Sequence, residues 1–164
     1  MIDIDSLWRR VVAGASRHAR LLHGVSHWAR VERNGVYLAR RTAGASELIV
    51  RLFAVFHDCM RLNESTDPDH GRRGAEYARG VRGELAELPD DQFEKLCYAC
   101  EWHTGRVGTD DPVVGVCWDA DRLDLPRAGI QPEPKYMFSD TAKQIAATRG
   151  FHLLDEIPLR DFSD

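Results

Sequence analysis

Apolar residues recur along nearly the whole chain with a period close to 3.6, which is the spacing of one face of an α-helix. The row at 48–56 is apolar on nearly all sides, as expected of a helix at the centre of a fold. No two-residue hairpin signal joins alternating runs, so we expect an all-α fold without a sheet. The rows predict six to seven helices, around residues 7–15, 28–38, 48–56, 74–85, 93–100 and 114–125, with a seventh suggested at 141–147.

The length fits a single compact domain, since 164 residues is close to the usual size of one. We expect a helical domain over residues 1–149 and a short irregular C-terminal extension over residues 150–164. The sequence leaves open whether this extension packs on the domain or on a partner chain. It also allows a homodimer without setting the oligomeric state.

The charge balance narrows the choice of partners. With 22 basic and 26 acidic residues, the net charge of −4 argues against a broad basic face that binds nucleic acid. Only Lys95, Lys135 and Lys143 are lysines, so 19 of the 22 basic residues are arginines. The forked guanidinium group suits phosphate and carboxylate, which favours a small anionic, phosphorylated substrate.

We expect a cytoplasmic protein that does not enter a membrane. The longest apolar run, near residues 48–57, is interrupted by Arg51 and is far shorter than the ~18 residues of a membrane span. The first residues are acidic, unlike a secretory signal. Cys97 and Cys100 form a C-x-x-C pair without a second pair, and we interpret them as small apolar residues on a helix face.

Ionisable side chains fall on the apolar faces of five predicted helices. His103 continues the row of Phe93, Leu96 and Cys100, and Asp121 continues the row of its own helix. Taken singly, each group is explained by a backbone partner in the core. A metal cluster satisfies all of them together, because imidazole and carboxylate are ligands of divalent transition metals. The candidates are His27, His57, Asp58, His70, His103 and Asp121.

The order of these candidates along the chain resembles that of the HD-domain superfamily of metal-dependent phosphohydrolases. The family pattern is a histidine, a His-Asp doublet and a distant aspartate, matched here by His27, His57-Asp58 and Asp121. Asp119 is the alternative to Asp121, which we prefer because it stands in Ala-Asp-x-Leu. The resemblance spans roughly residues 20 to 126 and implies an HD-type helical domain.

The resemblance implies one or two divalent ions, of Mn, Fe, Ni or Mg. His27, His57, Asp58 and Asp121 would hold the first ion. Members with two metals carry extra histidines between the doublet and the last aspartate. His70 and His103 stand in that order, so they would hold a second ion bridged by Asp58.

The leading hypothesis is hydrolysis of a phosphate ester or anhydride, a nucleotide being one candidate, by metal-activated water. Asp58 and Arg61 are the predicted catalytic residues. The predicted substrate-binding residues are Arg61, Arg30, Arg122 and His23, although each arginine also fits a solvated surface position.

Two other hypotheses stay open. Some HD-fold proteins hold a di-iron pair with six ligands of this kind and oxidise substrates with O₂. The other hypothesis is a metal-dependent ligand-binding domain without catalytic activity. The chain lacks the signatures of the well-known HD phosphohydrolases, such as Gly-Tyr-Pro after His103, and therefore indicates no particular substrate.

Overall fold

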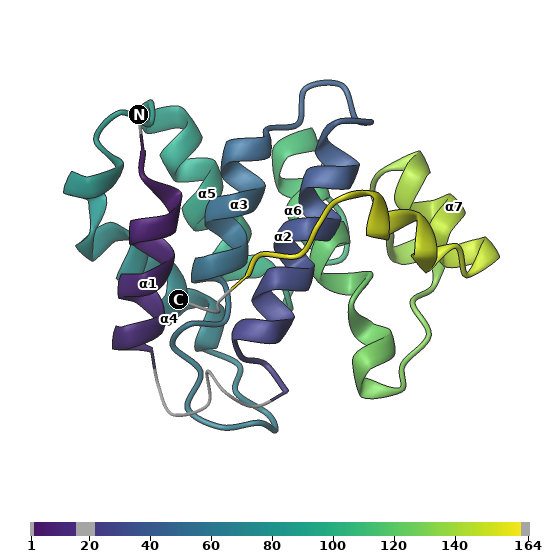
Figure 1. Cartoon of the computed structure of the whole chain (residues 1–164), viewed down its shortest axis with the longest axis horizontal. Coiled ribbons are helices and arrows are strands. Elements are labelled where there is room, and N and C mark those ends of the chain that lie inside the picture. The colour runs from purple at the N-terminus through teal and green to yellow at the C-terminus, as the bar shows by residue number, and fades with distance from the viewer. Residues whose placement is uncertain (1, 16–21, 162–164) are drawn as a thin grey trace.

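The computed structural model describes residues 2–15 and 22–161. Within these residues the chain is all-helical, which confirms the predicted fold class (Figure 1). Among the described residues, none of the helices combines the length and the hydrophobicity of a membrane span. The α-helices are α1 (Ile4–Gly14), α2 (Val25–Ala39), α3 (Glu47–Phe56), α4 (His70–Gly80), α5 (Asp90–Trp102), α6 (Pro112–Arg122) and α7 (Asp140–Thr148). Short 3-10 helices join or follow them: η2 (Arg82–Leu85), η3 (Leu125–Ala128), η4 (Pro134–Tyr136) and η5 (Phe151–Glu156).

Helix α3 is the centre of the fold, as its apolar sequence predicts. Seven of its ten residues are buried, from Ile49 to Phe56. It packs against α1, α2, α4, α5 and α6, and Figure 1 shows it between α2 and α5. The side chain of Ser46 caps its first turn by accepting the Ile49 N–H. The central helix therefore carries the residues at its C-terminal end deep into the protein.

Two predicted helices are shorter than their apolar rows. Helix α4 ends at Gly80, and Leu85 lies in η2. Helix α6 ends at Arg122, and Leu125 begins η3, whose second residue is Pro126. A proline has no N–H to continue the helical ladder, and glycine weakens it, so both helices stop while the apolar spacing continues.

The C-terminal segment packs on the helical body in the structure. Residues of η5 contact α2, and Leu154 and Ile157 are buried. Farther along, the Arg160 guanidinium donates two hydrogen bonds to the carboxylate of Glu32 on α2. These contacts hold the C-terminal segment, up to residue 161, against α2, whose first turn contains His27.

Two glycines in α4 let this helix approach two others backbone to backbone. A Cβ at Gly74 would collide with the carbonyl oxygen of Phe56, and a Cβ at Gly71 would collide with that of Cys100. Phe56 is the last residue of α3, directly before His57, and Cys100 lies in the last turn of α5, where its carbonyl faces the Nδ1 of His103. The glycines therefore set how closely His70, the first residue of α4, approaches the other histidines.

We expect Gly74→Ala to destabilise the protein by about 1–3 kcal/mol, the usual cost of overpacking, because the obstructing atom is backbone and cannot rotate away. Gly80→Ala is the matched control on the same helix. No atom lies within 4 Å of a Cβ at Gly80, so the change should be neutral or stabilising through helix propensity. Urea unfolding of both variants checks the prediction. Equal midpoints for the two would contradict it.

Candidate metal centre

Helix ends bring all six predicted ligands to one place. His27 lies in the first turn of α2 and Asp121 in the last turn of α6. His70 begins α4, and His103 directly follows α5. The expectation that every ionisable candidate lies on a helix face is wrong for His57 and Asp58, since α3 ends at Phe56 and both residues lie in the turn that follows. That turn lets two consecutive side chains reach one site, which a straight helix disfavours because neighbours diverge by about 100°.

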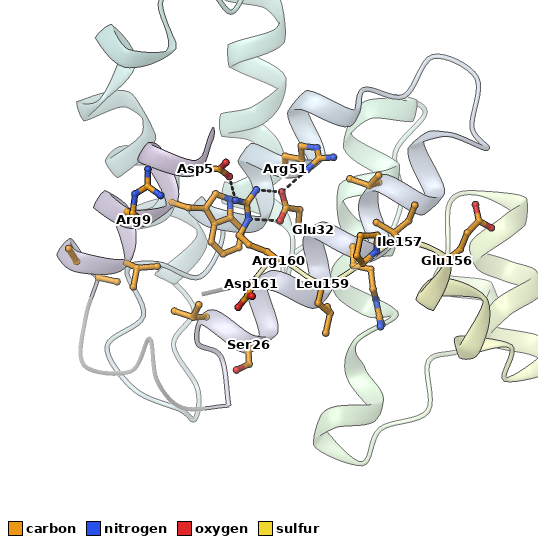
Figure 2. Close-up of a pocket in the computed structure, with 18 of the residues that line it drawn as sticks. Asp5, Arg9, Ser26, Glu32, Arg51, Glu156, Ile157, Leu159, Arg160 and Asp161 are labelled. Carbon is orange, nitrogen blue, oxygen red and sulfur yellow. Dashed lines mark hydrogen bonds and ion pairs between the residues drawn. The ribbon is translucent and has the colours of Figure 1, made fainter. Parts of the chain in front are cut away.

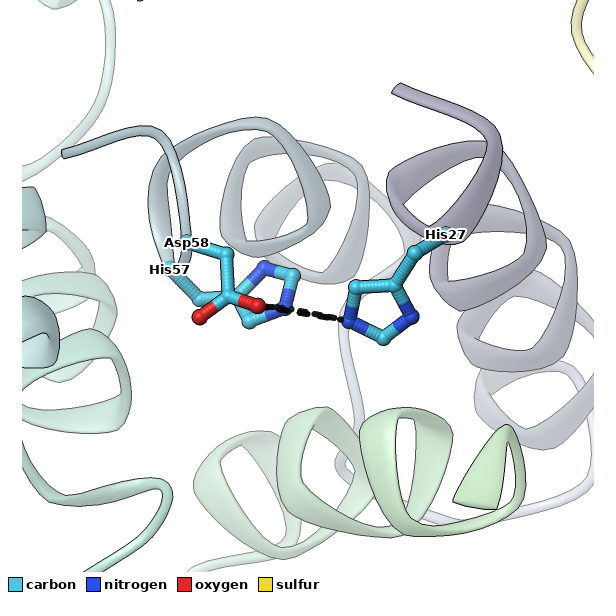
Figure 3. Close-up of side chains that lie close together, drawn as sticks. All are labelled: His27, His57 and Asp58. Carbon is cyan, nitrogen blue, oxygen red and sulfur yellow. Dashed lines mark hydrogen bonds and ion pairs between the residues drawn. The ribbon is translucent and has the colours of Figure 1, made fainter. Parts of the chain in front are cut away.

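The first half of the cluster is built on His27 and His57. Their Nε2 atoms lie 3.1 Å apart. Asp121 Oδ1 lies 3.2 Å from the His27 Nε2 and 3.8 Å from the His57 Nε2. Asp58 Oδ2 approaches the same two nitrogens at 3.6 and 3.8 Å, and Figure 3 shows the contact between this carboxylate and the His27 ring as a dashed line. Two imidazoles and two carboxylates thus surround one point.

The second half repeats this arrangement with His70 and His103. Their Nε2 atoms lie 2.9 Å apart. The other oxygen of Asp58, Oδ1, lies 3.1 Å from the His70 Nε2 and 3.5 Å from the His103 Nε2. The Asp58 carboxylate therefore spans both halves, with one oxygen on each histidine pair.

Every one of the four rings is fixed through its outer nitrogen. Three Nδ1 atoms face backbone carbonyls, which only accept, so these nitrogens must carry the hydrogen. His27 uses a carboxylate instead, with 2.7 Å between its Nδ1 and Asp124 Oδ2. The carbonyl acceptors are Phe53 and Ala54 for His57, Asp67 for His70 and Cys100 for His103. Each neutral ring therefore turns the lone pair of its Nε2 toward the cluster, which is the metal-binding form.

Burial and neighbouring charge shift the pKa values of the donor groups in different directions. Burial lowers the pKa of His27 and His103, but contacts with nearby carboxylates outweigh it, so both pKa values are raised. Burial lowers the pKa of His57 to about 3, so this ring is neutral at pH 7. Burial alone would raise the pKa of Asp58, but the neighbouring histidines hold it well below its usual value. The pKa of Asp121 is likewise lowered, against the effect of burial, by its contacts with His27 and His57. Both carboxylates are therefore ionised and ready to coordinate a cation.

The donor set fits divalent metal ions. Nε2 atoms face each other at 2.9 and 3.1 Å, an arrangement that is repulsive between two neutral rings unless a metal ion or a proton is shared between them. Asp58 Oδ1 is buried and accepts no hydrogen bond of good geometry from the part of the chain that the structure describes. An unsatisfied buried acceptor costs about 1–3 kcal/mol. Two groups of potential ligands result, His27–His57–Asp58 and Asp58–His70–His103.

The structure separates Asp121 from its alternative. Asp119 is fully buried and faces away, because its carboxylate accepts the backbone N–H groups of Phe138 and Ser139 at 2.7 and 2.8 Å. It thereby fixes the start of α7. Asp121, two residues on, reaches His27 instead, as the different directions of i and i+2 on a helix require.

The four predicted substrate-binding residues lie in different settings. Arg61 is buried, 3.7 Å from Asp58 Oδ1 and beside His70, with Nε and Nη2 bonded to the carbonyls of Asn63 and Ser65. His23 lies next to His27, with 6.3 Å between ring centroids, and its Nδ1 pairs with Glu64.

The other two arginines are held by neighbouring groups. Arg30 donates from Nε to Asp124, at 2.7 Å. Arg122 donates to the carbonyls of Arg106, Val107 and Tyr136. The structure therefore brings Arg61 and His23 to the cluster, while Arg30 reaches it through Asp124. A substrate role for any of the four stays a prediction.

The sequence prediction gave Asp124 no role. This buried carboxylate links His27 to Arg30 and lies 3.6 Å from Arg127. Its position three residues after Asp121 could have indicated that Asp124 lies near the cluster, because residues i and i+3 share a helix face. The orienting group for His70 was also missed, since it is the backbone carbonyl of Asp67, while the Asp67 side chain binds Arg73.

A pocket opens beside the cluster. Its volume is about 390 Å³, and His103 and Asp121 form part of its wall. A larger cavity of about 1200 Å³ lies between α1, α2 and the C-terminal segment and shares no residue with the cluster. Figure 2 shows the main charges in that cavity paired, with Arg160 bonded to Glu32 and Asp5, and Arg51 to Glu32. Of these two cavities, the smaller one adjoins the candidate metal centre.

Comparison with protein families agrees with this geometry. Residues 24–125, more than half of the chain, match the HD domain. Comparisons with curated proteins and with solved structures find no match. The chain belongs to the HD domain family, whose members bind divalent metals and are generally metal-dependent hydrolases. The His–Asp cluster described above is compatible with such a metal site.

Proposed function

We propose that this protein is a metal-dependent phosphohydrolase that cleaves a phosphate ester or anhydride of a small anionic substrate. One observation carries the proposal: the carboxylate of Asp58 lies between two histidine pairs, each with its Nε2 atoms turned inward, beside an open pocket. This donor set suits two divalent ions that share Asp58. Bound there, such ions polarise a phosphoryl oxygen and lower the pKa of a water nucleophile.

The chain's own residues would orient the reacting groups. Asp58 and Asp121 place two ionised carboxylates at the cluster, and the histidines are held rigidly by their outer nitrogens. Arg61 adds a fixed positive charge 3.7 Å from Asp58, where charge on the transferring phosphoryl group would be stabilised. His23, paired with Glu64 beside His27, is proposed to contact the substrate from the opposite half.

The test is hydrolysis by metal-free protein to which Mn²⁺, Fe²⁺, Ni²⁺ or Mg²⁺ is added singly. The substrates are p-nitrophenyl phosphate, its bis ester and pyrophosphate. We expect metal-dependent product release that is lost in Asp58→Asn and kept in Asp69→Asn, an exposed carboxylate in the same region. No hydrolysis of any of the three with any metal would overturn the proposal.

A second candidate is a di-iron oxygenase, favoured by the number of donors. Six protein ligands in two halves with a bridging carboxylate also suit iron at both positions. Oxygen consumption by the iron-loaded protein, followed with an electrode across small-molecule substrates, separates the two. Consumption without phosphate release would favour the oxygenase.

A further inference from the structure

The pocket beside the metal centre gathers exposed apolar side chains. Val107, Ile130 and Tyr136 are 60%, 52% and 40% exposed, and all three line this one opening. They come from two separate segments, before α6 and around η4. Single exposed apolar residues are ordinary on a protein surface, but several gathered at one cavity indicate a binding site.

The inner part of the pocket is also apolar and leads to the ligands. Met137 and Pro132 are buried at its wall, and Leu125 contributes from η3. His103 and Asp121 belong to the same lining. A molecule whose charged end is held at the cluster would therefore place its remaining part against apolar side chains.

Arg122 holds the two walls together. Its guanidinium donates to the carbonyls of Arg106 and Val107 on one wall and to that of Tyr136 on the other. Since these acceptors are backbone atoms, the opening is fixed independently of the side chains at its rim. Preformed sites lose less conformational entropy when a ligand binds.

We propose that this pocket receives a flat, apolar organic group of the substrate while the phosphoryl group lies at the His–Asp cluster. The inference rests on the proposed phosphohydrolase function and adds the chemical class of the organic part of the substrate. An aryl ring fits this class, and so does the face of a nucleobase. A volume of about 390 Å³ lies at the small end of the range for small-molecule sites.

The test compares two phosphonates that differ only in this group and whose P–C bond a phosphohydrolase does not cleave. Binding of phenylphosphonate and methylphosphonate to the manganese-loaded 164-residue chain is measured by titration calorimetry. We expect phenylphosphonate to bind at least about 10-fold more tightly, because the ring leaves water on binding. Ile130→Ser should reduce this preference about 3- to 10-fold and leave methylphosphonate binding unchanged.

Leu153→Ser is the matched control, since Leu153 is an exposed leucine on η5 that does not line the pocket. It should keep the full preference. Adenosine monophosphate is then tested as a competitor of phenylphosphonate. Competition that is weaker in Ile130→Ser would assign the flat group to a nucleobase. No competition would favour a ring joined closer to phosphorus.

The two proposals fail in different ways. Equal binding of the two phosphonates, or a preference that survives Ile130→Ser, would overturn the pocket assignment while ester hydrolysis still supports the phosphohydrolase. No binding of either phosphonate together with no hydrolysis of any ester would overturn both.

Discussion

Asp58→Asn is expected to remove most of the stabilisation that the protein gains from metal. At a free Mn²⁺ concentration 1,000 times the dissociation constant, one bound ion stabilises the wild-type fold by about 4 kcal/mol. Loss of the charged donor should weaken binding at least about 100-fold. At the same metal concentration the gain then falls to about 1.4 kcal/mol or less.

The size of this effect follows from the position of Asp58. Its two oxygens face different histidine pairs, so a single substitution alters both halves of the cluster. Asparagine keeps the shape but presents one neutral oxygen and one NH₂ group, which donates and cannot coordinate. The histidines keep their outer hydrogen bonds, since these do not involve Asp58.

Urea unfolding of metal-free and manganese-loaded protein gives the metal-dependent gain for each variant. Asp69→Asn removes one charge close to the cluster from a side chain that is 61% exposed, and it should behave as wild type. Circular dichroism of metal-free Asp58→Asn establishes that it folds. A full metal-dependent gain in folded Asp58→Asn would show that this carboxylate is not a ligand.

The sequence contained most of the fold, because helical periodicity is a local property of the chain. The row at 48–56 predicted the central helix, and the structure places α3 there. What local spacing did not show is where each helix stops. Apolar spacing ran on through Leu85 and Leu125, while glycines near the end of α4 and Pro126 after α6 ended the helices earlier.

The candidate site was predictable where its donors are side chains on buried faces. His103 and Asp121 followed apolar rows, and the structure brings both to the cluster. The groups that orient the donors were harder to foresee. Three of the histidines are oriented by backbone carbonyls, which have no sequence signature. The turn at His57–Asp58 depends on α3 ending at Phe56, directly before the doublet.

The pairing of His27 with Asp124 yields the second large prediction. Asp124 accepts from the His27 Nδ1 at 2.7 Å and from the Arg30 Nε at 2.7 Å. A carboxylate on the outer nitrogen fixes the ring and raises its basicity as a ligand, and loss of such a partner typically costs 10- to 100-fold in metal affinity. We expect Asp124→Asn to weaken metal binding at the His27 half of the cluster by about that factor. The reason is that the amide has a single oxygen and can accept from only one of the two donors.

The loss should be confined to one half of the cluster, because His70 and His103 are oriented by backbone carbonyls that Asp124 does not touch. Calorimetric titration with Mn²⁺ should therefore show one site of unchanged affinity and one weakened site. Asp119→Asn is the control: it removes a buried carboxylate of α6, five residues before Asp124, whose partners are the backbone N–H groups of Phe138 and Ser139. That variant should lose stability against urea and keep both metal affinities. Equal weakening of both ions by Asp124→Asn, or of neither, would contradict the orienting role, since only the His27 half depends on this side chain.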